Sequence, residues 1–177
     1  MEAIILDMDR ERELKWTFGA IKTFEKRGRE ILKRLDLKNE RGQTVATAPM
    51  PAGGILANFL RLSDILEAAV GAATGLSSLE GKKGEPSEAS DAIEMYLQRG
   101  GTIETLQNEI YKAFLQATDP SSIPFWQENI AKEAETRRIN QEKQAARLEI
   151  ARLELAADQE KVKRLSGSQS IPSGSPS

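Results

Sequence analysis

The chain has 177 residues, of which 39% are hydrophobic and 29% are charged, and its formal net charge is −2. It contains no cysteine and no histidine, which excludes disulfides, thiolate or imidazole metal sites and nucleophile–imidazole catalysis. The charge is unevenly spread, with a net +2 in residues 1–50, −5 in residues 51–126 and +1 in residues 127–177. No segment is basic enough to make phosphate-backbone binding the default expectation, so nucleic acid is an unlikely partner.

The apolar runs of the chain are short. None approaches the roughly 20 residues that a bilayer-spanning helix needs, so we expect no membrane partner. Residues 1–12 include several acids and lack the apolar core of a signal peptide. The sequence therefore predicts a protein that stays in the cytoplasm in which it is made.

The first 17 residues predict a short β-hairpin. Residues 3–6 are an apolar run, residues 7–13 are a charged stretch typical of a turn, and Leu14 and Trp16 alternate with Lys15 as in a half-buried strand. Because an isolated hairpin is marginally stable in water, it must pack on the helices that follow.

An amphipathic helix is predicted over residues 18–35, with Thr17 as its N-cap. Gly28 interrupts its pattern, which indicates a break or a close approach of another segment. Trp16 and Phe18 lead into the apolar face and are expected in the core. The apolar face contains Phe18, Ile21, Phe24, Ile31, Leu32 and Leu35, and bases and two acids share the opposite face.

The middle of the chain predicts three further helices separated by polar segments. Residues 39–54 have no helical periodicity and predict a linker, whereas residues 55–70 are the most apolar segment and predict one central core helix. Residues 77–90 predict a polar loop, in which Gly81-Lys82-Lys83-Gly84 lacks the spacing of a phosphate-binding loop. A short helix over residues 91–98, with Ile93, Tyr96 and Leu97 inward, is followed by a helix over residues 103–117. That last helix is capped by Thr102 and has Ile103, Leu106, Ile110, Phe114 and Leu115 on one face.

A long charged helix is predicted over residues 125–165, because no Gly or Pro occurs between Pro124 and Gly167. Pairs such as Glu128–Lys132 and Glu133–Arg137 have the favoured i,i+4 order. Leu148 and Leu155 belong to a heptad column whose partner column is too polar for a complete coiled-coil seam. Apolar surface is left at Leu148, Ile150, Leu153 and Leu155, which favours a binding partner that covers it; the alternative is that the helix is a solvated appendage. From Ser166 the composition of Ser, Gly and Pro predicts a disordered tail.

One segment resembles a known family. The run Arg12-Glu-Leu-Lys-Trp-Thr-Phe-Gly-Ala-Ile-Lys-Thr-Phe-Glu-Lys-Arg-Gly28 is similar to the opening of tail assembly chaperones from long, flexible-tailed bacteriophages and gene-transfer agents. That family begins with a hairpin and a helix of the form Phe-Gly-Ala-Ile-x-x-Phe-Glu. A strongly apolar helix, a short helix ending in Gly-Gly and an amphipathic helix follow, to which residues 55–70, 91–101 and 103–117 are similar. Residues 120–177 extend beyond the compact family domain.

The resemblance implies a non-enzymatic function in the host cytoplasm, without a cofactor. Such chaperones coat the tape measure protein, keep it soluble and bring tail tube protein to it, and in longer members the extension contacts the tube protein. We expect the client groove between the helices at 18–35, 55–70 and 103–117. The candidate partner-binding residues are Phe24, Phe59, Leu66 and Phe114 on its floor, with Leu148 and Leu155 in the long helix; the first four are also what an ordinary core would use.

Two other interpretations remain open. A structural virion or scaffold protein would form a permanent homo-oligomer through the helix at 125–165. A nucleic-acid-binding accessory protein would use the basic face between Lys22 and Arg34. An enzyme is the least favoured class, because catalysis would have to use Asp, Glu, Lys or Ser alone. The expected organisation is therefore mainly α-helical, with a compact domain at 1–119, a long helix at 120–165 and a tail at 166–177.

Overall fold

The computed structural model describes residues 3–36, 50–79 and 85–167, and side chains as far as Lys161. The predicted linker at 39–54, loop at 77–90 and tail from Ser166 therefore lie partly outside the described residues. The chain divides into one unit from Met1 to Ile123 and a second from Pro124 to Ser177. The described residues are mainly α-helical with a small N-terminal β-hairpin, as predicted, and the first boundary lies four residues beyond the predicted one.

The hairpin consists of β1 (Ile5–Asp7) and β2 (Glu11–Glu13), paired antiparallel with Leu6 opposite Arg12. The charged stretch that was predicted to be a turn thus supplies all of β2 and the last residue of β1. The prediction placed both strands too far from the turn. The reason is Met8, which is completely buried and continues the inward alternation begun by Ile4 and Leu6.

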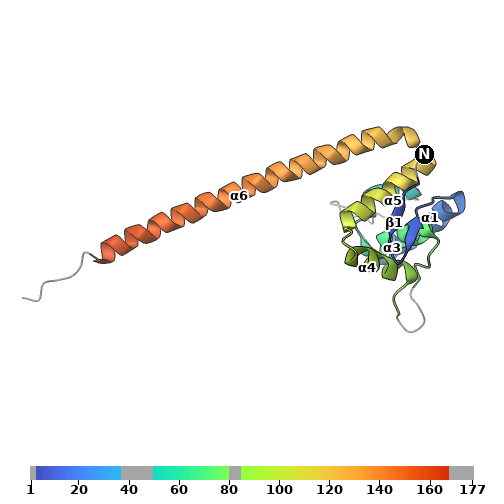
Figure 1. Ribbon diagram of the computed structural model, residues 1–177, viewed down its shortest axis with the longest axis horizontal. Helices are drawn as coiled ribbons and strands as arrows, with labels where there is room; N and C mark the ends of the chain where they lie inside the picture. The colour runs from blue at the N-terminus through green and yellow to red at the C-terminus, as the bar shows by residue number, and fades with distance from the viewer. Residues whose placement is uncertain (1–2, 37–49, 80–84, 168–177) are drawn as a thin grey trace, which may run out of the picture. The chain divides into compact units, whose positions relative to one another are not determined.

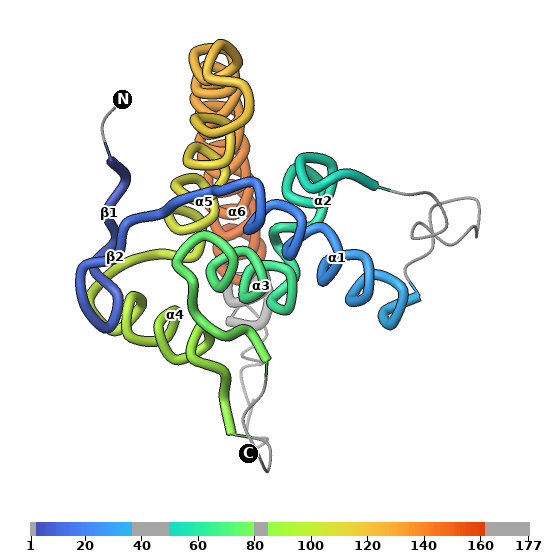
Figure 2. Tube along the Cα trace, turned by 90° about the vertical axis from the view of Figure 1, so that its right-hand side faces the viewer, coloured from blue at the N-terminus to red at the C-terminus, as the bar shows by residue number. Residues whose placement is uncertain are grey.

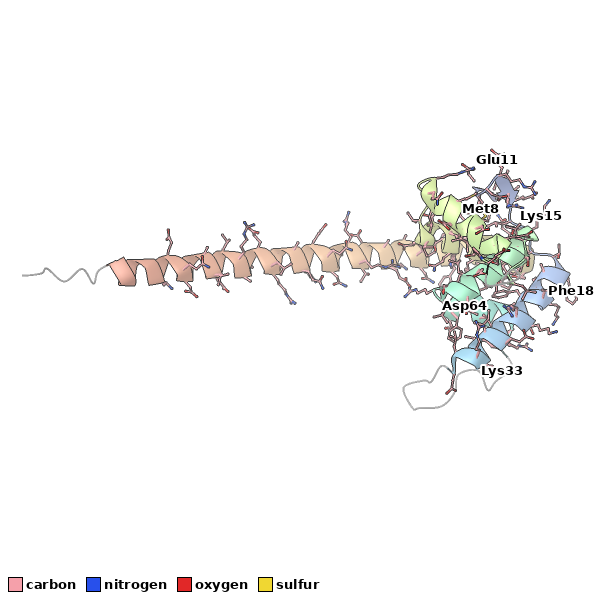
Figure 3. The ribbon with its side chains drawn as sticks, turned by 90° about the horizontal axis from the view of Figure 1, so that it is seen from below. Met8, Glu11, Lys15, Phe18, Lys33 and Asp64 are labelled. Carbon is pink, nitrogen blue, oxygen red and sulfur yellow. The ribbon has the colours of Figure 1, made fainter. Side chains whose placement is uncertain are left out.

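Helix α1 (Phe18–Leu35) begins as predicted, since the Thr17 hydroxyl accepts a hydrogen bond from the Ala20 N–H at 3.1 Å. Phe24, Ile31 and Leu32 are buried, but the prediction that Phe18 is a core residue is wrong. Phe18 is 77% exposed, and the Lys22 ammonium lies over its ring. Figure 3 labels Phe18 at the beginning of α1. At the first helical position its side chain precedes the part of α1 that meets the core. Leu35, at the other end, is also partly exposed.

The apolar segment predicted as one helix forms two, α2 (Ala52–Phe59) and α3 (Ser63–Thr74). Leu62 is extended, with φ −78° and ψ 130°, and its N–H bonds the Phe59 carbonyl at 2.9 Å. One straight helix that is apolar on all sides would leave part of its surface in water, whereas two short helices turn those residues inward. The two glycines assigned to the linker lie inside α2.

Helices α4 (Glu88–Gln98) and α5 (Ile103–Thr118) complete the first unit, and a 3-10 turn, η2 (Pro120–Ser122), follows. Helix α4 begins three residues before the predicted start because Ser87 caps it. The Thr102 cap is confirmed, and α5 ends one residue beyond the predicted range. Tyr96, Leu106, Ile110, Phe114 and Leu115 are buried and Ile93 packs against the core as predicted, but Leu97 and Ile103 are partly exposed.

Helix α3 is the centre of the first unit. It packs against α1, α2, α4 and α5, and seven of its 12 residues are buried. Figure 2 shows α1 and α2 on one side of α3 and the hairpin and α4 on the other. The Lys15 N–H donates to the Ala73 carbonyl at 2.8 Å, which fixes the hairpin to the end of α3.

The second unit contains helix α6 (Ile123–Gly167), which is continuous over 45 residues and is the longest helix labelled in Figure 1. It includes the predicted range and two more residues at each end. The predicted pairs are present, with 2.6 Å between Glu128 and Lys132 and 3.4 Å between Glu133 and Arg137. None of the helices in the described ranges is long and apolar enough to cross a membrane.

Candidate functional site

The four residues predicted to form a groove floor are core residues in this structure. Phe24, Leu66 and Phe114 are buried, and Phe59 is half-buried against the same cluster. Trp16 joins two of them, because its ring meets those of Phe24 and Phe114 edge-on, with 5.4 Å between centroids in both pairs. These rings stabilise the packing of the hairpin on the helices and leave little surface for a partner.

The close approach predicted at Gly28 is present. A Cβ atom there would lie 3.1 Å from two side-chain carbons of Ile55, so α1 passes α2 at a distance that only glycine permits without movement. The helices of the predicted groove also pack directly on one another, α1 against α2 and α3, and α5 against the same two helices. The space into which a client side chain was expected to insert holds the protein's own side chains.

The basic face of α1 is compensated in part, by the two acids that lie on it. Glu25 pairs with Arg29 and lies 3.9 Å from the Lys22 ammonium, and Arg27 lies 3.9 Å from Glu30. These i,i+3 and i,i+4 pairs reduce the field that a phosphate backbone would meet.

Helix α6 presents apolar side chains to solvent. Leu148 and Leu155 are 73% and 61% exposed, and because they are seven residues apart they lie within about 20° of each other around the helix. We call this pair the Leu148 stripe. It is available for contact, as an exposed partner-binding residue must be.

A second apolar stripe lies on the opposite side of α6. It contains Ile150 and Leu153, which were predicted to be apolar surface but lie outside the heptad column of Leu148 and Leu155. Its members repeat at spacings of seven, four, three and four and are centred about 180° from Leu148. Testing every heptad frame would have found it. This Ile150 stripe consists of Ile139, Ala146, Ile150, Leu153 and Ala157, all exposed.

The polar positions of α6 make ion pairs along the helix. Arg138 lies 2.8 Å from Glu135 and 3.8 Å from Glu142, in addition to the two predicted pairs. Such pairs support a solvated helix by a few tenths of a kcal/mol each, about as much as exposed pairs usually contribute. They keep α6 helical while its leucines remain in water.

An open cleft occurs between β1 and α5. Its volume is about 470 Å³, and both strand residues and one face of the helix line it. The local sequence pattern does not predict this cleft, because its two walls are about a hundred residues apart in the chain. The lining residues are Ala3, Ile4, Ile5, Leu6, Thr105, Glu109, Lys112 and Gln116.

The ion pair between Asp9 and Arg12 stabilises the hairpin. The Asp9 carboxylate accepts two hydrogen bonds from Arg12, at 2.6 and 2.7 Å, and these bonds lower the pKa of Asp9 to about 2. This bidentate pair holds the hairpin turn. Within the described ranges no group of three or more acidic residues is placed to hold a metal ion.

Comparisons of the chain with protein-family models, curated proteins and solved structures found no match. The candidate sites are therefore those that the residues themselves define. They are the two apolar stripes of α6 and the cleft between β1 and α5.

Proposed function

We propose that the protein is a tail assembly chaperone of a long-tailed bacteriophage or gene-transfer agent, acting in the host cytoplasm. In this function it binds the tape measure protein, keeps it soluble and helps recruit tail tube subunits around it. The activity is binding without catalysis, and it uses no cofactor.

The observation that carries this proposal is the pair of exposed apolar stripes on α6. A solvated helix with leucines on opposite sides is suited to packing against other helices, because their apolar faces interdigitate at the same spacing. The resemblance of residues 12–28 to the opening of the chaperone family, and the hairpin-plus-helices order of the first unit, support the same function.

A stripe of two or three large side chains suits reversible coverage of a long client. Burying one leucine contributes about 1.5–3 kcal/mol, so one copy binds modestly and many copies along the client add up through avidity. Reversible binding also fits a client that must later be released into the tail tube.

The first test is co-expression of the full chain with the tape measure protein of the same genome. We expect the soluble fraction of the client to rise, and the two proteins to elute together with several copies of this chain per client. A client that precipitates to the same extent with and without this chain contradicts the proposal.

Variants of α6 sharpen this test, because exposed residues can be changed without removing core packing. Leu148→Gln/Leu155→Gln and Ile150→Gln/Leu153→Gln should each weaken client binding by about tenfold or more, since each removes two apolar anchors. The matched control is Glu149→Gln/Glu154→Gln, which changes the same turns of the helix and removes no apolar surface. Equal loss in the control variant would show that the stripes are not the binding surface.

A scaffold protein that forms a permanent homo-oligomer through α6 is the second candidate, and the same two stripes favour it. Opposite stripes allow one helix to contact two neighbours, as in a bundle. Sedimentation distinguishes the two functions: a fixed oligomer without client at low micromolar concentration supports the scaffold, and a monomer or weak dimer supports the chaperone. A scaffold is also retained in purified particles in stoichiometric amount, whereas a chaperone is absent.

A further inference from the structure

The cleft between β1 and α5 has no part in the function proposed above. It is formed entirely within the first unit, and β1 and α5 lie next to each other in Figures 1 and 2. Its lining includes four consecutive residues from Ala3 to Leu6 and none from β2, so the cleft follows the edge of β1 that faces away from its partner strand.

The hydrogen-bond register of the hairpin shows which backbone groups face the cleft. The Leu14 N–H bonds the Ile4 carbonyl at 2.9 Å, and the Met8 N–H bonds the Arg10 carbonyl at 3.1 Å. In an antiparallel pair, hydrogen-bonded and non-hydrogen-bonded positions alternate, so Ile4, Leu6 and Met8 use their N–H and C=O groups toward β2. The N–H and C=O groups of Ile5 must then point to the outer edge.

Both the side chain of Ile5 and its backbone N–H and C=O groups are therefore accessible at this edge. The side chain is 56% exposed, although Ile4 and Leu6 on either side of it are buried. Natural proteins usually protect such an edge with a charge, a proline or a covering segment, because unpaired edge groups bind other extended chains. Residues 3–6 carry neither a charge nor a proline, and the one charged residue of β1, Asp7 at its end, is paired with Arg99.

The opposite wall of the cleft is a polar stripe of α5. Thr105, Glu109, Lys112 and Gln116 recur at spacings of four, three and four, which places them on one side of the helix. Glu109 and Lys112 form an ion pair at 3.7 Å with about a third of each side chain exposed. This wall is internally neutral, so it offers no charge for a charged ligand to meet.

We propose that this cleft binds an extended, uncharged peptide segment of a partner protein, which adds to the outer edge of β1 as a third strand. The Ile5 N–H and C=O groups pair with the peptide backbone, the Ile5 side chain contacts an apolar peptide residue, and the α5 stripe contacts the outer side of the peptide.

The dimensions agree with a short strand. Four extended residues span about 13 Å, and the α5 stripe rises about 16 Å between Thr105 and Gln116. The volume of about 470 Å³ falls within the range of about 300–1,000 Å³ that ligand sites usually have.

The backbone groups of Ile5 also decide the class of ligand. A client helix cannot pair with them, because the N–H and C=O groups inside a helix are already bonded to each other. A lone segment fits better than β1 of a second copy, since the second copy would bring its own α5 to the same side of the joined strands. The binding of helical clients by α6 and the binding of extended segments by β1 are therefore separate activities.

The experiment is a titration of the isotope-labelled full chain with a synthetic peptide, acetylated and amidated, of sequence Gly-Thr-Val-Thr-Val-Thr-Gly. We expect NMR shifts confined to the amides of β1 and the α5 stripe, and slower hydrogen exchange at the Ile5 amide. The same peptide N-methylated at every residue between its two glycines, which removes the N–H donors of both edges, should give no such shifts.

Two variants at one position separate the backbone from the side chain. Ile5→Pro removes the outward N–H, at an edge position where proline is compatible with a strand, and should weaken binding by about tenfold or more. Ile5→Thr retains the N–H and the strand preference and should bind within about threefold of the original chain. In a Trp126→Phe background, in which Trp16 is the remaining tryptophan, fluorescence shows whether each variant is folded.

Three results would overturn the proposal. They are a titration without shifts at β1, N-methylated and unmethylated peptides that bind equally well, and a concentration-dependent dimer that Ile5→Pro abolishes. The last result would assign the edge to a second copy of this chain. None of these results bears on the binding of a helical client by α6.

Discussion

At the scale of single residues, Trp16 connects the most distant parts of the first unit. Its ring contacts Phe24 and Phe114, and its indole N–H donates to the Ile110 carbonyl at 3.2 Å, 94 residues further along the chain. The alternation of residues 14–16 is enough to predict that Trp16 is buried. The residues that Trp16 contacts depend on how α1 and α5 pack together, and the local sequence pattern does not specify that packing.

The close contact between Gly28 and Ile55 predicts that a larger residue at position 28 destabilises the protein. Gly28→Ala should lower the free energy of unfolding by about 1 kcal/mol, because overpacking of about 1–3 kcal/mol outweighs a gain in helix propensity of about 1 kcal/mol. A Cβ atom at Gly19, in the same helix, would lie 3.9 Å from the Thr17 hydroxyl, so Gly19→Ala should not destabilise the protein. Urea unfolding measures both, and equal effects at the two positions would contradict the close approach.

The Asp9–Arg12 pair makes the stability of the fold depend on pH. The pKa of Asp9 is lowered in the folded state from 3.8 to about 2, so the pair stabilises the fold above pH 3.8 and this contribution is lost as pH falls through about 2. Carbon-detected NMR titration should place the Asp9 midpoint near 2. Arg12→Lys keeps the charge but loses the two-pronged hydrogen bond and should raise that midpoint; an unchanged midpoint would show that the hydrogen bonds are not the cause.

At the scale of elements, the beginnings of α1 and α5 were predicted correctly, whereas the beginnings of α2, α3, α4 and α6 were not. The Thr17 and Thr102 caps are confirmed because capping depends on a side chain and an amide three residues away, which the sequence contains. The break between α2 and α3 was missed because every residue from Ile55 to Val70 is compatible with one helix. It is favoured by burial against α1, α4 and α5, and by the Gln107 amide, which donates to the Leu60 carbonyl at 3.2 Å.

Ser87 is the cap most sensitive to substitution. It is buried, accepts a hydrogen bond from the Ser90 N–H at 3.0 Å and donates to the Glu67 carboxylate, so it connects α4 to α3. Ser87→Ala should lower the free energy of unfolding by about 1–2 kcal/mol, because it removes a helix cap and leaves buried polar groups with fewer hydrogen-bond partners.

The control for Ser87 is Ser63→Ala, at the exposed first position of α3. The Ser63 hydroxyl makes only a 3.4 Å contact with its neighbour Asp64, so this variant should change the free energy of unfolding by less than about 0.5 kcal/mol. Chemical unfolding followed by circular dichroism compares the two. A Ser87 variant as stable as the Ser63 variant would show that the α3–α4 link contributes little.

At the scale of the whole molecule, the described chain consists of one unit with a core and one long helix. The core residues all lie before Pro124, so the first unit has what it needs to fold alone. A chain of residues 1–123 should unfold cooperatively at the same urea midpoint as the full chain. A chain of residues 1–110, which lacks Phe114 and Leu115, should lose that transition, and a lower midpoint for residues 1–123 would show that stability depends on the second unit.

The sequence by itself determined the helical class, the caps, the long charged helix and the identity of most buried residues. These properties depend on interactions between residues a few positions apart, or on whether a side chain is apolar. The tertiary structure decided that the predicted groove floor is core and that Phe18 is exposed. It also decided that β1 and α5 form a cleft. Each of these outcomes depends on segments that are 30 to 110 residues apart, and their contact follows from the shapes of whole packed helices.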